Sequence, residues 1–501
     1  MTRRFSAPVE PLVETNVFRQ RGRMSTDVPD IQDIRPRLPV PVFPEDPNWE
    51  TLYWTAWETV WRAIRPPSPD STLVACHPRP FPNGAIEMEP TAFVANLSGY
   101  APITPTPVEL LNNFYAAQHE DGFIPGALDT AGGADFYDSF DPNSVGPNLL
   151  AWVEWRYFRL TGHKERVAAV FPHLLAQHRW RRANRTWRSG LYWTTAYAGG
   201  LTNQPRVPGT RYHHNHWVWI DASAQAAVDA AMLERMAVLL EQPAVAEEIA
   251  AERETLIQKI NAEMWNEKAL FYQDIGPNDQ FSPVKSIAAY WALVDPQLVP
   301  RDRRSAFIQH LRDSWSFRTE YVLPSLSADS EGYNARTGNG YRGGVWPSLT
   351  YMVLRGLGVA DQHLLAHKLA VNHLEQIAHT YEQTGCFWRS YAPETIGPGE
   401  PGQADETGLT AAVIVPMILE NILGIAVDWP LRQVTWRRHL ERAQGYGVRN
   451  LPLGSEGTVD LFGVGDSVSI RSDVPFTLAI HGDQDIIQMA VPAGSFDISL
   501  K

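Results

Sequence analysis

The segment GNGYRGGVWPSLTYMVLRGL, residues 338–357, is the part of this chain that says most about its fold. Its paired glycines and its proline predict a loop that ends where a helix begins, near Trp346. Tyr341, Arg342 and Trp346 combine aromatic and polar groups that the buried face of a helix does not need. The segment therefore predicts a helix whose N-terminal loop forms the rim of a pocket.

Helical periodicity recurs on both sides of this segment. In WETLYWTAWETVWRAI, residues 49–64, Trp54, Trp57 and Trp61 are three and four positions apart, the spacing of one buried helix face. The chain has no credible run of alternating strands before residue 425, so the pattern predicts an all-α toroid in which an outer ring of helices wraps an inner ring. The other predicted helices are 107–119, 147–161, 164–184, 222–240, 244–265, 286–293, 301–313, 346–357, 363–381 and 409–423.

Both ends of the chain differ from this helical region. Residues 1–47 are rich in Pro, Arg and Asp and have little periodicity, which predicts an arm lying over the surface. Residues 426–501 hold short alternating apolar segments separated by Gly and Asp, which predict a small β-rich appendage. We therefore expect residues 48–425 to form one helical barrel that carries the active site.

Composition excludes several classes of partner. The chain has 43 basic and 56 acidic residues, a net charge of -13, which does not favour nucleic acid or an anionic membrane surface. Its two cysteines, Cys76 and Cys386, are too far apart in sequence to suggest a disulfide framework or a metal cluster. The first residues contain no apolar stretch long enough for a signal peptide or a membrane span. We therefore predict a cytoplasmic protein.

Seven segments carry a family resemblance. They are QHEDGFIPG (118–126), GLTNQPRVP (200–208), WVWIDASAQAAVDAAMLERMA (217–237), INAEMWNEKALFYQDI (260–275), PSLSADSEGY (324–333), GYRGGVWPSLTYMVLRGL (340–357) and TGCFWRSYAPE (384–394). In this order they resemble the (α/α)6-barrel glycosidases of the trehalase and glucosidase I superfamily, and in particular the branch of mannosylglycerate and glucosylglycerate hydrolases. The resemblance spans about residues 49–424. It implies an (α/α)6 toroid with a small C-terminal β extension that acts on a small sugar or glycoside.

The resemblance also implies a pair of catalytic carboxyl groups, which this sequence lacks at the matching positions. Inverting glycosidases use an acid and a base roughly 6.5–9.5 Å apart. The family's acid is the Asp of a motif like GMDNSPR, which here is Thr202, and its base is the Glu of a motif like TGTxWENYAPE, which here is Arg389. A guanidinium stays protonated and cannot act as that base. A third position, an Asp in a family motif like WDTAF, matches Glu89. We therefore predict a non-standard acid and base.

Four residues are candidates for the missing catalytic roles. Glu406 and Asp221 each stand near the start of a predicted helix, where a carboxylate also serves as a helix cap. His214 and His216, in the tract RYHHNHW, carry imidazoles that can act as acid or base near neutral pH. The alternative for the tract is a polar loop or a metal site, and no nearby Cys or HExxH pattern completes such a site. We predict no metal.

The predicted substrate-binding residues come from the same family motifs. We expect Arg389 to bind an anionic or carbonyl group, and no Gly-rich phosphate loop indicates a cofactor. The function we predict is a carbohydrate-active enzyme of glycoside hydrolase ancestry; the alternatives are an isomerase or lyase that uses the same pocket, and a catalytically silent sugar-binding protein. The set is Glu89, Thr202, Asn203, Arg206, Tyr341, Arg342, Trp346, Trp388, Arg389 and Glu394.

Overall fold

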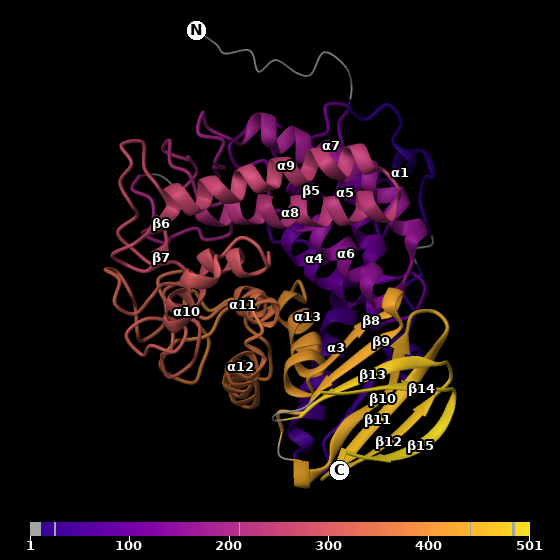
Figure 1. Cartoon of the computed structure of the whole chain (residues 1–501). Coiled ribbons are helices and arrows are strands. Elements are labelled where there is room, and N and C mark those ends of the chain that lie inside the picture. The colour runs from indigo at the N-terminus through magenta and orange to yellow at the C-terminus, as the bar shows by residue number, and fades with distance from the viewer. Residues whose placement is uncertain (1–11, 25–26, 210, 441, 483–485, 501) are drawn as a thin grey trace.

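A computed structural model describes residues 12–24, 27–209, 211–440, 442–482 and 486–500 (Figure 1). Helices are the main regular elements up to residue 422, and strands dominate after it. The α-helices are α1 (Val17–Gln20), α2 (Ile31–Ile34), α3 (Pro47–Ala63), α4 (Met88–Ala95), α5 (Asn112–Ala117), α6 (Leu150–Thr161), α7 (Lys164–Asn184), α8 (Ile220–Leu239), α9 (Pro243–Lys259), α10 (Arg301–Gln309), α11 (Pro347–Val359), α12 (His363–Thr384) and α13 (Leu409–Pro416).

Short helices of other types complete the helical part. The 3-10 helices are η1 (Arg35–Arg37), η2 (Asn96–Gly99), η3 (Pro107–Leu111), η5 (Ile287–Leu293), η7 (Trp429–Leu431) and η8 (Arg442–Gln444). Two π-helical turns, η4 (Ile260–Met264) and η6 (Met417–Ile422), extend α9 and α13. The predicted helices 107–119 and 244–265 therefore each consist of two helical types in succession.

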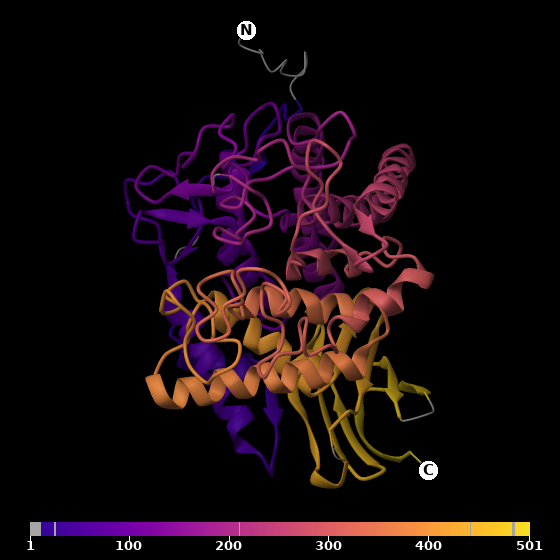
Figure 2. The same cartoon turned by 90° about the vertical axis from the view of Figure 1, so that its left-hand side faces the viewer.

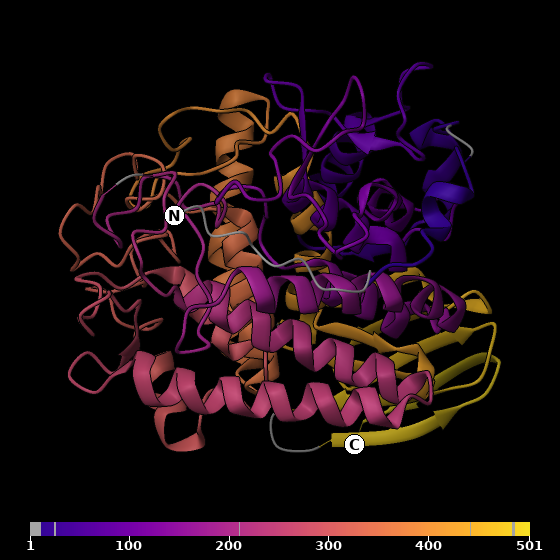
Figure 3. The ribbon, with the colours of Figure 1, turned by 90° about the horizontal axis from the view of Figure 1, so that it is seen from above.

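A closed inner ring of helices forms the centre of the fold. α4 packs on α6, α6 on α8, α8 on η5, η5 on α11 and α11 on α13, and α13 returns to α4. Outer helices cover the ring: α3 packs on α13, η3 on α4, α7 on α6 and α8, α9 on α8, and α12 on α11. Figures 1 and 3 show α8 and α9 side by side. The predicted (α/α)6 toroid is confirmed.

Side-chain pattern explains which helices form the inner ring. Every residue of α13 is buried, and so is every residue of η5, as expected for helices that are apolar on all sides. The outer α12 instead buries Ala366, Leu369, Ala370 and Leu374, which recur at spacings of three and four. No described helix combines the length and the apolar composition needed to cross a membrane.

The C-terminal strands form two sheets. One has the order β1-β10-β11-β12-β15 and the other β14-β13-β9-β8. β1 comes from the predicted N-terminal arm and pairs antiparallel with β10, Val40 opposite Arg449, so the arm and the appendage share one sheet. These strands are β1 (Val40–Val42), β8 (Ile425–Asp428), β9 (Gln433–Arg437), β10 (Tyr446–Leu453), β11 (Gly457–Val464), β12 (Ser467–Ser472), β13 (Phe476–His481), β14 (Ile486–Val491) and β15 (Gly494–Ser499).

Small two-stranded sheets lie in the loops of the helical part. They pair β2 (Ile64–Arg65) with β3 (His77–Pro78), β4 (Ala85–Glu87) with β5 (Ala127–Asp129), and β6 (Trp265–Asn266) with β7 (Phe271–Tyr272). Figure 2 shows loops from distant parts of the helical region coming together on the face turned toward the viewer. β4 leads directly into α4 and so carries its side chains to the N-terminal end of the inner ring.

Candidate functional site

A cavity of about 530 Å³ opens at the N-terminal ends of the inner helices. Its walls come from the loops that precede α4, α6, α8, α11 and α13. Its volume lies in the range of roughly 300–1,000 Å³ that is typical of small-molecule sites. Helix N-termini carry partial positive charge, so this end of the toroid favours electron-rich or anionic groups.

Two glutamates enter the cavity from the junction of β4 and α4. Glu87 ends the strand and Glu89 lies in the first turn of the helix, and both line the cavity. The Ser348 hydroxyl donates a hydrogen bond of 3.1 Å to Glu89 Oε1. Burial raises the pKa of both carboxyl groups, and Glu89 adds to the effect on Glu87, whose pKa is about 7. Glu87 therefore changes its protonation state near neutral pH.

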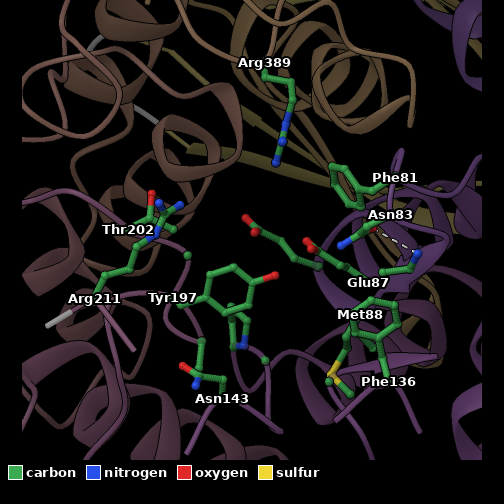
Figure 4. Close-up of a pocket in the computed structure, with 18 of the residues that line it drawn as sticks. Phe81, Asn83, Glu87, Met88, Phe136, Asn143, Tyr197, Thr202, Arg211 and Arg389 are labelled. Atoms are coloured by element: carbon green, nitrogen blue, oxygen red, sulfur yellow. Dashed lines mark hydrogen bonds between the residues drawn. The ribbon is translucent and has the colours of Figure 1, made fainter. Parts of the chain in front are cut away.

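Arg389 faces Glu87 across the cavity (Figure 4), and Glu89 lines the same cavity. Its guanidinium carbon lies 4.7 Å from the ring centroid of Phe81 and 5.8 Å from that of Trp346. One terminal nitrogen donates to Gln403 Oε1 at 3.3 Å, while the buried Nε has no hydrogen-bond partner in the part of the chain that the structure describes. The positive charge lowers the pKa of both glutamates, against the effect of burial. Arg389 thus offers a donor and a positive charge to whatever occupies the cavity.

An aromatic pair forms part of the same wall. The rings of Tyr341 and Trp346 stack with centroids 4.0 Å apart and planes 9° from parallel. The Trp346 indole donates to the Gly340 carbonyl at 3.1 Å, and Asn203 Oδ1 accepts from the Tyr341 amide at 2.8 Å. Gly340 has φ +66°, and a Cβ there would lie 2.8 Å from Asn203 Oδ1, so glycine is required. Such a rigid flat surface suits stacking on the C–H face of a sugar ring.

The structure brings some of the predicted site residues together at this cavity and leaves others elsewhere. Those that line the cavity are Glu89, Thr202, Asn203, Tyr341, Trp346 and Arg389. The predicted residues that are not part of its lining are Asp221, Arg206, His214, His216, Arg342, Trp388, Glu394 and Glu406.

Asp221 and Arg206 belong to a buried ion cluster. The Arg206 guanidinium donates to both oxygens of Asp221 at 2.9 and 3.1 Å, and to both oxygens of Asp274 at 2.7 and 2.6 Å. The side chains of Arg206 and Asp221 are 0% and 3% exposed. Asp274 Oδ1 also accepts from the backbone amide of Ile220, at the start of α8. This cluster joins three segments of the chain and fixes the start of an inner helix.

Glu406 lies at the surface, beside a different carboxylate that caps α13. Its side chain is 62% exposed and is 3.5 Å from Arg79. The capping role belongs to buried Asp405, whose two oxygens accept from the backbone amides of Leu409 at 3.0 Å and Thr410 at 2.8 Å. The carboxylate at the helix N-terminus is thus Asp405, and Glu406 points to solvent.

The histidine tract packs on tryptophans outside the cavity lining. The His214 ring lies 4.8 Å from that of Trp187 and 4.6 Å from that of Trp193. Burial and the neighbouring histidines lower the pKa of His214 to about 4. Within the described residues, no group of three or more His, Cys, Asp or Glu side chains is arranged to hold a metal ion. A catalytic role of His214 or His216 stays a prediction.

The other predicted residues outside the lining make contacts in the surrounding loops. Arg342 Nε donates to the Asn203 carbonyl at 3.3 Å, and the Trp388 indole donates to the Thr384 hydroxyl at 3.0 Å. Glu394 is exposed and accepts a hydrogen bond of 2.9 Å from the Tyr333 hydroxyl. Arg342 and Trp388 thus support segments that contribute cavity residues, Asn203 and Arg389.

Sequence reasoning did not select Glu87, and it left several other cavity residues outside the site. The signal for Glu87 was its spacing: it precedes Glu89 by two positions within the otherwise apolar stretch GAIEMEPTAF. Tyr137, from the loop GADFYDSFDPN before α6, also lines the cavity. The further lining residues that carry polar or aromatic groups are Phe81, Asn83, Phe136, Asn143, Tyr197, Arg211 and Gln403.

Fold and site together define a toroid of the glycoside hydrolase type. Residues 109–400 match the model of the mannosylglycerate hydrolase MGH1-like glycoside hydrolase domain, which is more than half of the chain. The chain belongs to this family.

Individual relatives are more distant. An uncharacterized protein of Borreliella burgdorferi is 25% identical over 359 residues, 70% of this chain and 73% of that protein. A probable mannosyl-oligosaccharide glucosidase of Schizosaccharomyces pombe is 25% identical over 54% of this chain and 33% of its own length. The crystal structure of a mannosylglycerate hydrolase from Thermus thermophilus in complex with glucose has a TM-score of 0.59 at 21% identity, over 73% of this chain and 99% of that one. That structural likeness supports the fold.

Proposed function

We propose that this protein is a carbohydrate-active enzyme that cleaves a small glycoside with Glu87 as its acid. The observation that carries the proposal is the meeting of Glu87, Glu89 and Arg389 in a cavity walled by Tyr341 and Trp346. The positions that match the family's acid and base hold Thr202 and Arg389, neither of which can exchange a proton near neutral pH. The two glutamates are the carboxyl groups that this cavity offers in their place.

Glu87 donates the proton to the leaving oxygen in this proposal. A carboxyl group whose pKa is about 7 is still protonated at slightly acidic to neutral pH and releases its proton readily in that range. Glu89 accepts hydrogen bonds from a sugar hydroxyl or from the attacking water, while Ser348 holds its other oxygen. Because burial raises the pKa of both carboxyl groups, and because the charge of Glu89 also raises the pKa of Glu87, the pair retains a proton that a single exposed glutamate would lose.

Arg389 binds rather than transfers protons. Its guanidinium stays charged and faces Glu87 across the cavity (Figure 4). We infer that it holds an oxygen of the substrate that is negatively charged or becomes so during bond cleavage. The aromatic pair stacks against the sugar ring and so fixes the position of the scissile bond relative to Glu87.

The test is turnover of α-glucosides and α-mannosides followed by mass spectrometry and NMR. Hydrolysis adds one water across the cleaved bond, an isomerase leaves the mass unchanged, and a lyase releases an unsaturated fragment. Glu87→Gln should lower kcat by about 10²–10⁴-fold, because it removes the transferable proton and keeps the shape. The wild-type rate should fall as the pH rises through about 7, where Glu87 loses its proton.

Glu406→Gln and Asp221→Asn are the controls for this assignment. Neither residue is part of the cavity lining, so the folded variants should retain kcat within about twofold. Loss of turnover in either control with full activity in Glu87→Gln would overturn the assignment. Absence of any product from the whole panel would leave the protein as a sugar-binding one and contradict the proposed activity.

A further inference from the structure

Aromatic rings continue from the cavity to the protein surface. The ring centroids of Phe136 and Tyr137 are 5.1 Å apart, those of Tyr137 and Tyr197 are 6.0 Å apart, and those of Tyr197 and Tyr212 are 5.4 Å apart. The Tyr137 hydroxyl donates to the Tyr197 hydroxyl at 3.0 Å. Phe136, Tyr137 and Tyr197 line the cavity, and Tyr212 is 52% exposed. The four rings therefore make one continuous aromatic surface that leads out of the cavity.

The loop that carries Tyr212 is anchored to the cavity wall. Asn143 Nδ2 donates to the Tyr212 carbonyl at 3.2 Å, and the Thr195 hydroxyl donates to Asn143 Oδ1 at 2.7 Å. The Tyr197 amide donates to the Arg211 carbonyl at 3.1 Å. These bonds fix the backbone on both sides of the Tyr197–Tyr212 ring contact. The backbone of Tyr212 is thus tied to the cavity wall, and its ring lies against that of Tyr197.

The polar groups along this surface match those of a sugar-binding subsite. The Tyr197 ring faces the same space as Glu87 and Arg389 (Figure 4). The guanidinium of Arg211 lies 5.4 Å from the Tyr212 ring centroid, and Arg211 also lines the cavity. An exposed tyrosine with a neighbouring hydrogen-bond donor presents an apolar face and polar edges, which is the combination that a pyranose or phenyl ring requires.

We propose that Tyr197 and Tyr212 form a second subsite, at the outer edge of the sugar cavity, that binds a ring in the leaving group of the substrate. The inference rests on the proposed function, in which the first sugar ring occupies the cavity beside Glu87. It narrows the substrate class to glycosides with at least two rings, either a disaccharide or a glycoside of an aromatic alcohol. A leaving group of a few carbon atoms without a ring would leave Tyr212 uncovered.

Binding of matched one-ring and two-ring ligands tests this subsite. Isothermal titration calorimetry in the Glu87→Gln background avoids turnover, and the ligands are the methyl glycosides, the phenyl glycosides and the disaccharides of α-mannose and α-glucose. We expect at least one two-ring ligand to bind several-fold more tightly than its methyl glycoside. Adding Tyr212→Ala should lower the affinity for that ligand by about five- to tenfold, as expected for the loss of one aromatic stacking contact. The affinity for the methyl glycoside should change by less than about twofold.

Two further variants separate stacking from folding. Tyr212→Phe keeps the ring and should keep the two-ring affinity within about twofold. Trp315→Ala removes another exposed aromatic side chain, 77% exposed and outside the cavity lining, and should change no affinity. A comparison of the affinities for the disaccharide and for the phenyl glycoside shows whether the subsite prefers a sugar ring or an aromatic ring.

Each outcome bears on the subsite. The second subsite is overturned if Tyr212→Ala weakens the binding of one-ring and two-ring ligands equally. It is also overturned if Tyr212→Ala weakens binding no more than Trp315→Ala does. Neither result contradicts binding of a sugar in the cavity. If every methyl glycoside binds and no two-ring ligand binds more tightly, the subsite is again overturned. Failure of all glycosides to bind overturns both the subsite and the proposed function.

Discussion

Two clusters of one arginine and two carboxylates lie in this toroid, and they differ in how completely they are paired. In the buried cluster, Arg206 donates four hydrogen bonds of 2.6–3.1 Å to Asp221 and Asp274. In the cavity cluster, Glu87, Glu89 and Arg389 line one cavity, and among the described residues no hydrogen bond joins Arg389 to either glutamate. The arginine and the two carboxylates therefore bind one another in the buried cluster, whereas in the cavity cluster they face the space that a ligand would fill.

The difference separates a structural role from a binding role. A buried ion cluster with full hydrogen bonding holds its side chains in place, because separating them would strand charge in a medium of low polarity. Burial raises the pKa of Asp274 in that cluster as it raises the pKa of Glu87 and Glu89, but only the two glutamates line a cavity where they can exchange protons with a molecule that enters. The sequence has acidic residues in both clusters. Their surroundings in the folded protein distinguish the cluster that stabilises the fold from the cluster that can bind a ligand.

The largest expected effect comes from breaking the buried cluster. Arg206→Met leaves Asp221 and Asp274 side by side without a counter-charge, and should lower the free energy of unfolding by about 3–5 kcal/mol. Urea unfolding followed by circular dichroism measures the change. Arg188→Met, at an exposed arginine, is the control and should change stability by less than about 0.5 kcal/mol. A loss below about 1 kcal/mol for Arg206→Met would show that the cluster is not what holds the start of α8.

The sequence predicted the scaffold better than the reacting groups. The periodicity of α12 and the apolar runs of α8 and α13 carry enough local signal to define rings of helices. The glycines of the loop before α11 predicted a pocket rim at Tyr341 and Trp346, and both residues line the cavity.

The ion clusters left no such local signal. Arg206, Asp221 and Asp274 are separated by 15 to 68 positions along the chain, and no periodicity links them. Glu87 escaped selection because β4 and α4 are short and apolar at nearly every position, so neither element gives a periodic stripe. β4 pairs antiparallel with β5, Glu87 opposite Ala127, and both of these residues line the cavity.

A smaller effect should appear in the cavity cluster as the pH changes. Folding raises the pKa of Glu87 from about 4.5 to about 7, so the folded state binds a proton that the unfolded state releases. The resulting stability is complete below pH 4.5 and is lost as the pH rises through about 7. The side-chain amide of the Glu87→Gln variant has no charge over this pH range, so the variant does not lose this stability. Relative to wild type, its free energy of unfolding should therefore increase by about 2–3 kcal/mol between pH 4.5 and pH 8.5.

Urea unfolding at several pH values measures this difference directly. Glu406→Gln, which removes the charge of an exposed glutamate, is the matched control and should differ from wild type by a nearly constant amount over the same range. A difference for Glu87→Gln that stays flat with pH would show that Glu87 is ionised in the folded protein, and would remove the basis for its role as an acid.

The smallest effect separates two adjacent carboxylates at the start of α13. Glu406→Gln breaks only an exposed contact of 3.5 Å with Arg79 and should change the free energy of unfolding by less than about 0.5 kcal/mol. Asp405→Ala removes a side chain that accepts hydrogen bonds from the backbone of Leu409 and Thr410, and should cost about 1–2 kcal/mol. Thermal and urea unfolding of the two variants make the comparison. If both variants lose the same free energy of unfolding, Glu406 also stabilises the start of α13, and its side chain does more than contact Arg79 at the surface.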